Sequence, residues 1–529
     1  MKKLSSLLFI ALFLCAKSYS AVPFNVEIEQ ISIPNSPSLH SFAFAQYNGK
    51  WLFIGGRTNG LHGFSNTLPA FPRAYANRYI YVVDPNTNQV WSKNIYTDLN
   101  IAVADPLKTH NMEYYQNGQT LVMIGGMGLD SLRDSTVTFT TITAINVPGI
   151  INAVVNNQNI SSYVTQISDS RMQVCGGELS MIGNDYYLVG GHNFSGQYRS
   201  PANGEFFQKY TNQYKKFNLN ISGTITVSNY VAYTDSVNLH RRDMNLVPMI
   251  NPDGSQSLSL YGGVFKYEKD LPYQNPVYIN SSNYSVDNSF SQRFQQYSSA
   301  FLNMYDSVKK DMHTVFFGGT SLYYCDGITG QVKMDTLVPF IKDITSLSKL
   351  QNGTTVETIL PIKFTEYLGT NAKFIPVQNI QEYSNGVVKL NQYATRTLVG
   401  YMFGGIKVPL ANYTSGTASD RIFKIYLTYS PVGINQISSE VPSTFSLSQN
   451  YPNPFNPTTS IKFNVSKAGF VKVIIYNSLG REVEQLVNNN LSAGKYEVNW
   501  NASNQTSGVY FYKLVSENFS EVKKMMLVK

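Results

Sequence analysis

The chain has 529 residues and a formal charge of +8; 14% of its residues are charged and 13% are aromatic. A hydrophobic content of 43% excludes a disordered chain, and the low charged fraction excludes a long helical or coiled-coil protein. The 37 tyrosines, together with many Asn, Ser, Thr and Val residues, favour a β-rich protein.

The N-terminal segment has the pattern of an export signal. It opens on two lysines, continues with an apolar run over residues 7–16 and ends in small residues. This order is typical of a secretory signal peptide, and the run is too short for a membrane span, which needs about 20 residues. We therefore predict a signal peptide over residues 1–20, with a lipoprotein signal at Cys15 as the alternative. Two cysteines then remain, Cys175 and Cys325, either free or bridged to each other.

A repeated pattern fills most of the remaining chain. A Gly-Gly pair closes a short apolar segment six times, and successive copies are 56 to 86 residues apart. In several copies an Asn-Gly or Asp-Gly pair comes a few residues earlier, which favours a tight hairpin turn. A second hairpin follows the doublet, so a complete unit has four antiparallel strands. The doublets are Gly55-Gly56, Gly125-Gly126, Gly190-Gly191, Gly262-Gly263, Gly318-Gly319 and Gly404-Gly405.

These units resemble kelch-type β-propellers, whose motif is a diglycine followed by a spaced tyrosine and tryptophan. All six copies have the diglycine, whereas the aromatic pair is only partly present, with Trp91 as its best match. The resemblance implies an all-β fold in which residues 21–435 form a six-bladed kelch-like β-propeller, with seven blades as the alternative. The alternating strand at residues 26–33 is expected to pair with the strand at 421–429, which would complete the last blade and remove an open edge.

The end of the chain has a different composition. A polar segment at residues 436–448 predicts a linker, and the short alternating strands of residues 449–529 predict a small immunoglobulin-like β-sandwich. With its YPNPFNP start, GVYFYKL strand and basic tail, this segment resembles the type A C-terminal sorting domain of the type IX secretion system of the Bacteroidetes–Chlorobi group. The matching positions are Pro452, Asn453, Pro454, Gly508, Val509, Tyr510, Lys523 and Lys524.

That resemblance implies several partners and a location outside the cytoplasm. The type IX translocon would export the protein across the outer membrane, and a sortase would remove the domain. The cargo would then be secreted or held at the outer-membrane surface, in some cases by attachment to surface lipopolysaccharide.

The positive charge lies mostly in the two terminal segments, because the residues between them are nearly neutral. A neutral main domain does not indicate a nucleic-acid partner. Since no phosphate-binding loop, dinucleotide fingerprint or zinc motif is present, we predict neither a cofactor nor a metal.

Four residues are candidates for a ligand site in the propeller channel. His40, His110, Arg171 and Arg242 each lie 15 to 20 residues before a doublet, so we expect them at equivalent positions on four consecutive units. Such a group suits an anionic ligand, for example a carboxylated sugar; the alternative is a set of solvated channel residues. The leading hypothesis is a binding module for a glycan or a protein. The second is a carbohydrate-active enzyme at the channel mouth, for which a close pair of carboxylates would be expected.

Overall fold

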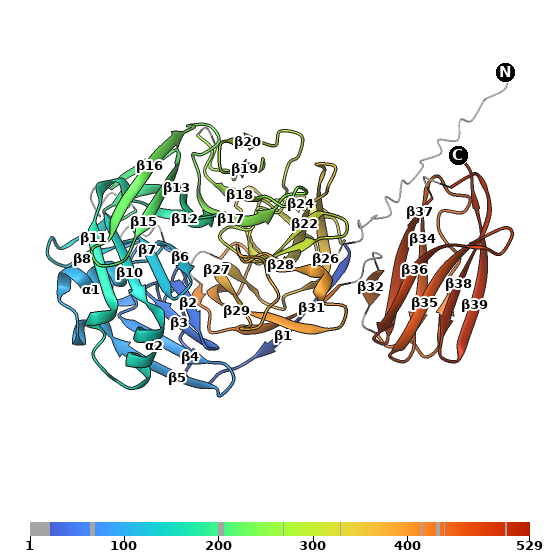
Figure 1. The fold of residues 1–529 in the computed structure, drawn as a ribbon, viewed down its shortest axis with the longest axis horizontal. Coiled ribbons are helices and arrows are strands. Elements are labelled where there is room, and N and C mark those ends of the chain that lie inside the picture. The colour runs from blue at the N-terminus through green and yellow to red at the C-terminus, as the bar shows by residue number, and fades with distance from the viewer. Residues whose placement is uncertain are drawn as a thin grey trace, which may run out of the picture.

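The computed structural model describes residues 22–63, 69–198, 206–267, 269–327, 329–413, 416–429, 434–438, 440–502 and 505–529. The signal peptide expected over residues 1–20 lies outside this part of the chain. Within it, no helix has the length and apolar character needed to cross a membrane. The fold is all-β, and its helices are short (Figure 1).

Five antiparallel sheets, each with four main strands in sequence order, follow one another from residue 43 to residue 363. They are β2 (Ala43–Tyr47), β3 (Lys50–Ile54), β4 (Tyr79–Asp84) and β5 (Gln89–Asn94); β6 (Glu113–Asn117), β7 (Thr120–Ile124), β10 (Thr141–Asn146) and β11 (Val164–Ser168); β12 (Cys175–Ile182), β13 (Asp185–Ser195), β15 (Gln213–Asn220) and β16 (Thr226–Thr234); β17 (Arg242–Ile250), β18 (Gln256–Val264), β19 (Val277–Ile279) and β20 (Tyr284–Val286); and β21 (Ala300–Asp306), β22 (Asp311–Thr320), β25 (Phe340–Lys349) and β26 (Thr355–Lys363).

The sixth sheet joins the two ends of this region. Its strands are β27 (Tyr367–Pro376), β29 (Thr397–Val408), β31 (Ile422–Tyr429) and β1 (Phe24–Ile31). β1 pairs with β31 along its whole length, from Phe24 opposite Tyr429 to Ile31 opposite Ile422. The predicted pairing of the N-terminal strand with the last strand is therefore confirmed.

Each sheet packs on the next through a buried apolar cluster, in chain order. The sixth sheet packs in the same way on the first, where the rings of Phe403 and Phe53 stack at 4.3 Å. Figure 1 shows these sheets placed around a common centre, with the labelled first strands β2, β6, β12, β17 and β27 nearest to it.

The diglycines explain how neighbouring sheets come so close. Both residues of each doublet have a positive φ, which L residues with a side chain rarely adopt. In the first doublet, a Cβ on Gly55 would lie 2.5 Å from the carbonyl oxygen of Thr109, in the connection to the next sheet. The backbone NH of Gly56 donates to that same oxygen at 2.8 Å. Glycine is thus required where one sheet's second strand ends against its neighbour.

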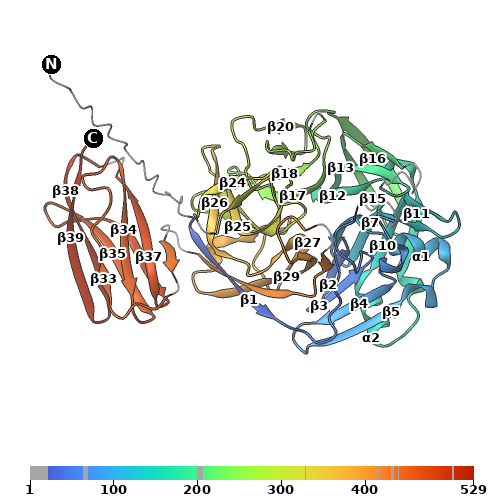
Figure 2. The ribbon, with the colours of Figure 1, turned by 180° about the vertical axis from the view of Figure 1, so that it is seen from behind.

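The C-terminal unit contains two four-stranded antiparallel sheets around one apolar cluster that includes Trp500 (Figure 2). Part of the expected linker belongs to it, because β32 (Ile434–Ser438) pairs with β37 and covers an edge that would otherwise lack hydrogen-bond partners. The sheets are β32, β37 (Gly494–Asn501), β34 (Thr458–Val465) and β33 (Ser446–Leu447); and β36 (Glu482–Leu491), β35 (Gly469–Asn477), β38 (Gly508–Ser516) and β39 (Phe519–Leu527).

Candidate functional site

Equivalent residues lie at or near the start of the six inner strands, and backbone hydrogen bonds join several of them to a neighbour. The NH of Asn111 donates to the carbonyl of Ser41 at 3.2 Å, and the NH of Gly176 donates to the carbonyl of Asn111 at 2.8 Å. Ser298 donates to Asp243 at 3.2 Å, and Asn371 donates to Ser298 at 3.1 Å. All six residues have a positive φ. We call this set the collar: Ser41, Asn111, Gly176, Asp243, Ser298 and Asn371.

Three of the four predicted site residues directly precede a collar residue. They are His40, His110 and Arg242, and each pairs across its hairpin with a residue that follows a diglycine. The complete set of residues before the collar is His40, His110, Cys175, Arg242, Tyr297 and Thr370.

Arg171 does not join them. It lies in a short 3₁₀-helix, η4 (Ser170–Met172), forms an ion pair with Asp169 at 2.5 Å and covers the ring of Tyr230 at 4.6 Å. Cys175 occupies the equivalent place in the third sheet. The sequence contained the signal for it, because Cys175 lies 15 residues before Gly190, the same spacing that identified His40 and His110. Cys175 and Cys325 do not form a disulfide.

Arg57 is a buried cation at the collar end of the first sheet, where it pairs with His40. Its residue is 4% exposed, its Nε donates to Asn59 Oδ1 at 2.9 Å, and one terminal nitrogen donates to the carbonyl of Pro72 at 2.8 Å. Among the described residues no carboxylate forms an ion pair with it. Burial lowers the pKa of Arg57 to about 10. A buried charge with only neutral partners is costly, so this guanidinium has a capacity for an anion that the described side chains do not meet.

Arg242 lies in an aromatic cage. A terminal nitrogen donates to the hydroxyl of Tyr198 at 2.8 Å, and the guanidinium carbon is 5.5 to 5.9 Å from the ring centres of Tyr198, Tyr210 and Phe265. Its Nε is 3.5 Å from Asp243 Oδ2. Asp243 also accepts a hydrogen bond from the Asn111 amide at 3.1 Å, so side chains of the second and fourth sheets meet at the collar.

The histidines near the two arginines are held neutral. Burial, assisted by Arg57, lowers the pKa of His40 to about 3. Burial, assisted by Arg242, lowers the pKa of His62 to about 4. The pKa of His110 is lowered by burial and by Arg57, and its ring lies 5.3 Å from that of Phe71. At neutral pH each imidazole can therefore donate one hydrogen bond and accept another.

Five of the six residues before the collar carry a buried polar atom without a hydrogen-bond partner among the described residues. Buried polar atoms are nearly always paired with protein, water or ligand. Five equivalent positions therefore each leave a polar atom whose hydrogen-bonding capacity the described residues do not meet. The atoms are His40 Nε2, His110 Nε2, Arg242 Nε, Tyr297 Oη and Thr370 Oγ1.

The long connections between second and third strands all leave the sheets at the collar end. Their described residues are 55–63 with 69–78, 125–140, 196–198 with 206–212, 265–267 with 269–276, 321–327 with 329–339, and 409–413 with 416–421. They carry short strands, namely β8 (Met127–Asp130), β9 (Ser135–Thr138), β14 (Phe207–Tyr210), β23 (Tyr323–Cys325), β24 (Val332–Met334) and β30 (Thr417–Ala418). Each also presents an exposed apolar side chain, and Tyr75, Leu132, Phe207, Tyr267, Leu337 and Leu410 are examples.

Sequence reasoning missed this convergence of the connections. The length of a connection does not show at which end of a sheet it lies. That end is known only once the pairing of the strands is known. The described residues contain no group of three or more His, Cys, Asp or Glu side chains arranged to hold a metal ion.

The predicted sorting residues lie close together in the C-terminal unit. Asn453, between Pro452 and Pro454, accepts a hydrogen bond on its side chain from the NH of Met526 at 2.9 Å. Gly508, Val509 and Tyr510 begin β38 and pair with the end of β39, while Lys523 and Lys524 of β39 pair with the middle of β38. The proline-rich start of the domain is thus bonded to its last strand.

Comparison with known proteins identifies this unit. Residues 449–529 match the family model described as "Secretion system C-terminal sorting domain". The predicted type IX sorting domain is therefore confirmed. It indicates interaction with the type IX secretion machinery and places the protein at the outer-membrane surface or outside the cell. No curated protein matches the chain.

Solved structures give only distant similarities. One described as "Structure of YjhT" is 12% identical, with 75% of this chain and 99% of that chain covered and a TM-score of 0.42. PorZ, described as an essential bacterial surface component of the type IX secretion system of Porphyromonas gingivalis, is 11% identical over 96% of this chain and 100% of its own, with a TM-score of 0.15. TcdA4 of Morganella morganii is 9% identical over 79% of this chain and 22% of its own, with a TM-score of 0.19.

Proposed function

We propose that the six-sheet region, from β1 to β31, forms a six-bladed kelch-like propeller that acts outside the cell as a binding module, with an anionic group of a glycan as its ligand at the mouth of the collar. The blade count is supported by six consecutive four-stranded sheets, by the packing of the sixth on the first, and by the place of β1 in the last sheet. The two sheets of the C-terminal unit support an immunoglobulin-like sandwich.

The observation that carries the ligand proposal is the charge balance at the collar mouth. Arg57 is buried there and the side chain of Arg242 is only 11% exposed, and among the described residues Asp243 is the one carboxylate that forms an ion pair with either. A carboxylated sugar would supply the missing charge, since a guanidinium binds a carboxylate with two parallel hydrogen bonds. The unpartnered atoms of His40 and His110 would bond to sugar hydroxyls.

The same balance favours binding over glycoside hydrolysis. Hydrolysis of a glycosidic bond ordinarily requires two carboxyl groups on either side of the scissile bond. Among the described residues, Asp243 is the one carboxylate that pairs with an arginine at the collar mouth, and it is already engaged by Arg242 and Asn111. Enzymatic activity therefore remains the second hypothesis, to be tested as turnover of any glycan that binds.

The test is a glycan array followed by calorimetric titration of the hits with the exported protein. We expect sugars that carry a carboxylate to bind and their carboxyl-reduced forms to bind at least tenfold more weakly. Arg242→Gln should abolish the preference for the carboxylate. Arg171→Gln is the matched control, because that arginine is exposed and paired with Asp169. Equal binding by wild type and Arg242→Gln would overturn the proposal.

We also propose that the secretion machinery's sortase removes the sorting domain and that the cargo is attached to surface lipopolysaccharide. Mass spectrometry of the mature protein should show the loss of residues from the C-terminal unit. A ladder of sizes on a gel would mark lipopolysaccharide attachment, whereas a single sharp species in the medium would contradict attachment.

A further inference from the structure

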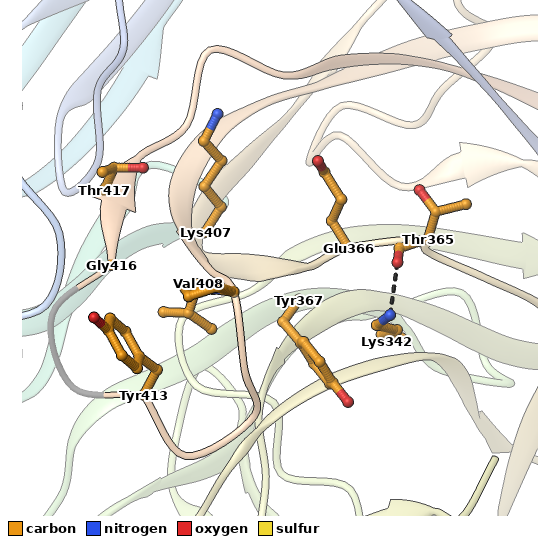
Figure 3. Close-up of a pocket in the computed structure, with 10 residues that line it drawn as sticks. Lys342, Thr365, Glu366, Tyr367, Lys407, Val408, Tyr413, Gly416 and Thr417 are labelled. Atoms are coloured by element: carbon orange, nitrogen blue, oxygen red, sulfur yellow. Dashed lines mark hydrogen bonds between the residues drawn. The ribbon is translucent and has the colours of Figure 1, made fainter. Parts of the chain in front are cut away.

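A groove separate from the collar mouth lies between the fifth and sixth sheets. It has a volume of about 630 Å³, within the ~300–1,000 Å³ range of small-molecule sites. Its walls come from β25, from the connection that leads into β27, and from β29 with the connection after it (Figure 3). The residues that matter for its chemistry are Lys342, Glu366, Tyr367, Lys407, Tyr413 and Thr417.

The charged groups of this groove already have partners. Lys342 Nζ donates to the carbonyl oxygen of Thr365 at 2.6 Å and lies 4.5 Å from the ring centre of Tyr367. Figure 3 shows this bond along one wall. Lys407 Nζ donates to Asp420 at 3.1 Å. An ionic ligand would have to compete with these contacts.

The carboxylate in the groove is also paired. Glu366 accepts two hydrogen bonds from the Arg421 guanidinium, each 2.9 Å long. Arg421 in turn lowers the pKa of Glu366, so this carboxylate stays ionised and keeps its arginine. The groove thus differs from the collar mouth, where Arg57 forms no ion pair with a described carboxylate.

Two tyrosines give the groove its apolar surface. The side chains of Tyr367 and Tyr413 lie on its wall below the polar groups, with Val408 between them in the view of Figure 3. Tyr413 is 44% exposed. Aromatic faces of this kind offer an apolar body with a polar tip, which suits the C–H face of a sugar ring. The remaining lone pairs and donors of Glu366, Lys407 and Thr417 lie at the rim, where ring hydroxyls would reach them.

We infer that this groove is a second binding site and that its ligand class is a neutral oligosaccharide. The assignment rests on paired charges, two tyrosine surfaces and a polar rim in a cavity of suitable volume. It does not depend on the anionic site at the collar mouth. Because both sites lie at the collar end of the molecule, an acidic polysaccharide with neutral stretches would reach both.

The test is titration of the full chain with neutral hexasaccharides of glucose, xylose, mannose and galactose. We expect at least one to bind with an affinity that is unchanged in 0.5 M salt. Tyr413→Ala should weaken this binding at least tenfold, and Tyr413→Phe should retain it within threefold. Tyr75→Ala is the matched control, because Tyr75 is 46% exposed on the equivalent connection of the first sheet.

Two results would overturn the inference. One is the absence of binding by every hexasaccharide of the panel. The other is binding that Tyr413→Ala leaves unchanged or that Tyr75→Ala weakens equally. Arg242→Gln should leave the neutral ligand bound, so failure here and failure at the collar mouth are distinguishable.

Discussion

Two buried arginines show how differently the same side chain is used at the residue scale. Arg241 is fully buried, and its guanidinium donates to the carbonyls of Asn238, Gly262 and Asn275 at 2.7 to 3.0 Å while covering the ring of Tyr273. The Arg57 guanidinium donates to two neutral acceptors, Asn59 and Pro72, and both lie in its own connection. Arg241 thus has the contacts of a structural residue, whereas Arg57 has the free capacity for an anion that the proposed site at the collar mouth requires.

Replacement of the two arginines by methionine should separate these roles. Arg241→Met leaves three carbonyls without their donor, and since each unsatisfied buried group costs about 1–3 kcal/mol, we expect a loss of about 3 kcal/mol or more in unfolding free energy. Arg57→Met removes a buried unpaired charge and should cost about 1 kcal/mol or less. Denaturant titration of both variants measures the difference; an equal loss would contradict the assignment.

A single carboxyl group in the second sheet should make stability depend on pH between mildly acidic and neutral solution. Burial raises the pKa of Glu113 to about 8, although its Oε1 accepts a hydrogen bond from the NH of Gly177 at 2.7 Å. Between the unfolded value of about 4.3 and a folded value of about 8, the folded state holds a proton that the unfolded state has lost. Stability therefore falls as pH rises, by about 1.4 kcal/mol per pH unit.

Glu113→Gln should remove this pH dependence, because the amide retains the acceptor and cannot ionise. We expect the variant to unfold like the wild type at pH 4 and to be about 3 kcal/mol more stable at pH 7. Denaturant titrations from pH 4 to pH 8 test this. A stability difference that stays constant with pH would mean that Glu113 is ionised in the folded protein.

At the scale of the strand, the diglycine can be tested against an ordinary turn glycine. Gly190 has φ +64°, and a Cβ there would lie 2.6 Å from the carbonyl oxygen of Arg241 in the next sheet's connection. Gly118 has φ +57°, but a Cβ there would meet nothing within 4 Å. Gly118→Ala should cost about 1–2 kcal/mol from its backbone conformation alone. Gly190→Ala should cost more, because two sheets must also move apart; thermal unfolding of the pair of variants measures this.

The same elements show what the sequence could and could not predict. The doublets and turns identified the strands because glycine conformation is a local property. The spacing rule placed His40 and His110 at equivalent positions. It fails for Arg171, because a residue 19 positions before Gly190 needs a longer hairpin than the short turn that joins β12 and β13. Spacing could not place Arg57, His62 and Phe71, because they lie in the long connection between β3 and β4 and not on an inner strand. The predicted linker includes the end of β32. Its polar composition does not indicate a strand, because the strand that it pairs with, β37, comes much later in the sequence.

At the scale of the whole molecule, the fold depends on one strand, β1, near the start of the described residues. β1 buries Phe24 and Val26 in the cluster shared by the fifth and sixth sheets, and supplies all the hydrogen bonds on one side of β31. Without it, β31 would become an exposed edge, which favours association with other chains. The C-terminal unit has its own apolar cluster and would not replace β1.

Two truncations should therefore differ in their effect on the stability of the six-sheet region. A chain that lacks residues 21–31 should lose its cooperative thermal transition or melt at least 10 °C lower and aggregate, because burial of Phe24 and Val26 and a full strand pairing are both lost. A chain that ends at residue 440 should keep the wild-type transition of the six-sheet region. Calorimetry and limited proteolysis distinguish the two. Equal melting of both truncated chains would show that β1 is dispensable and that the sixth sheet is stable with an open edge.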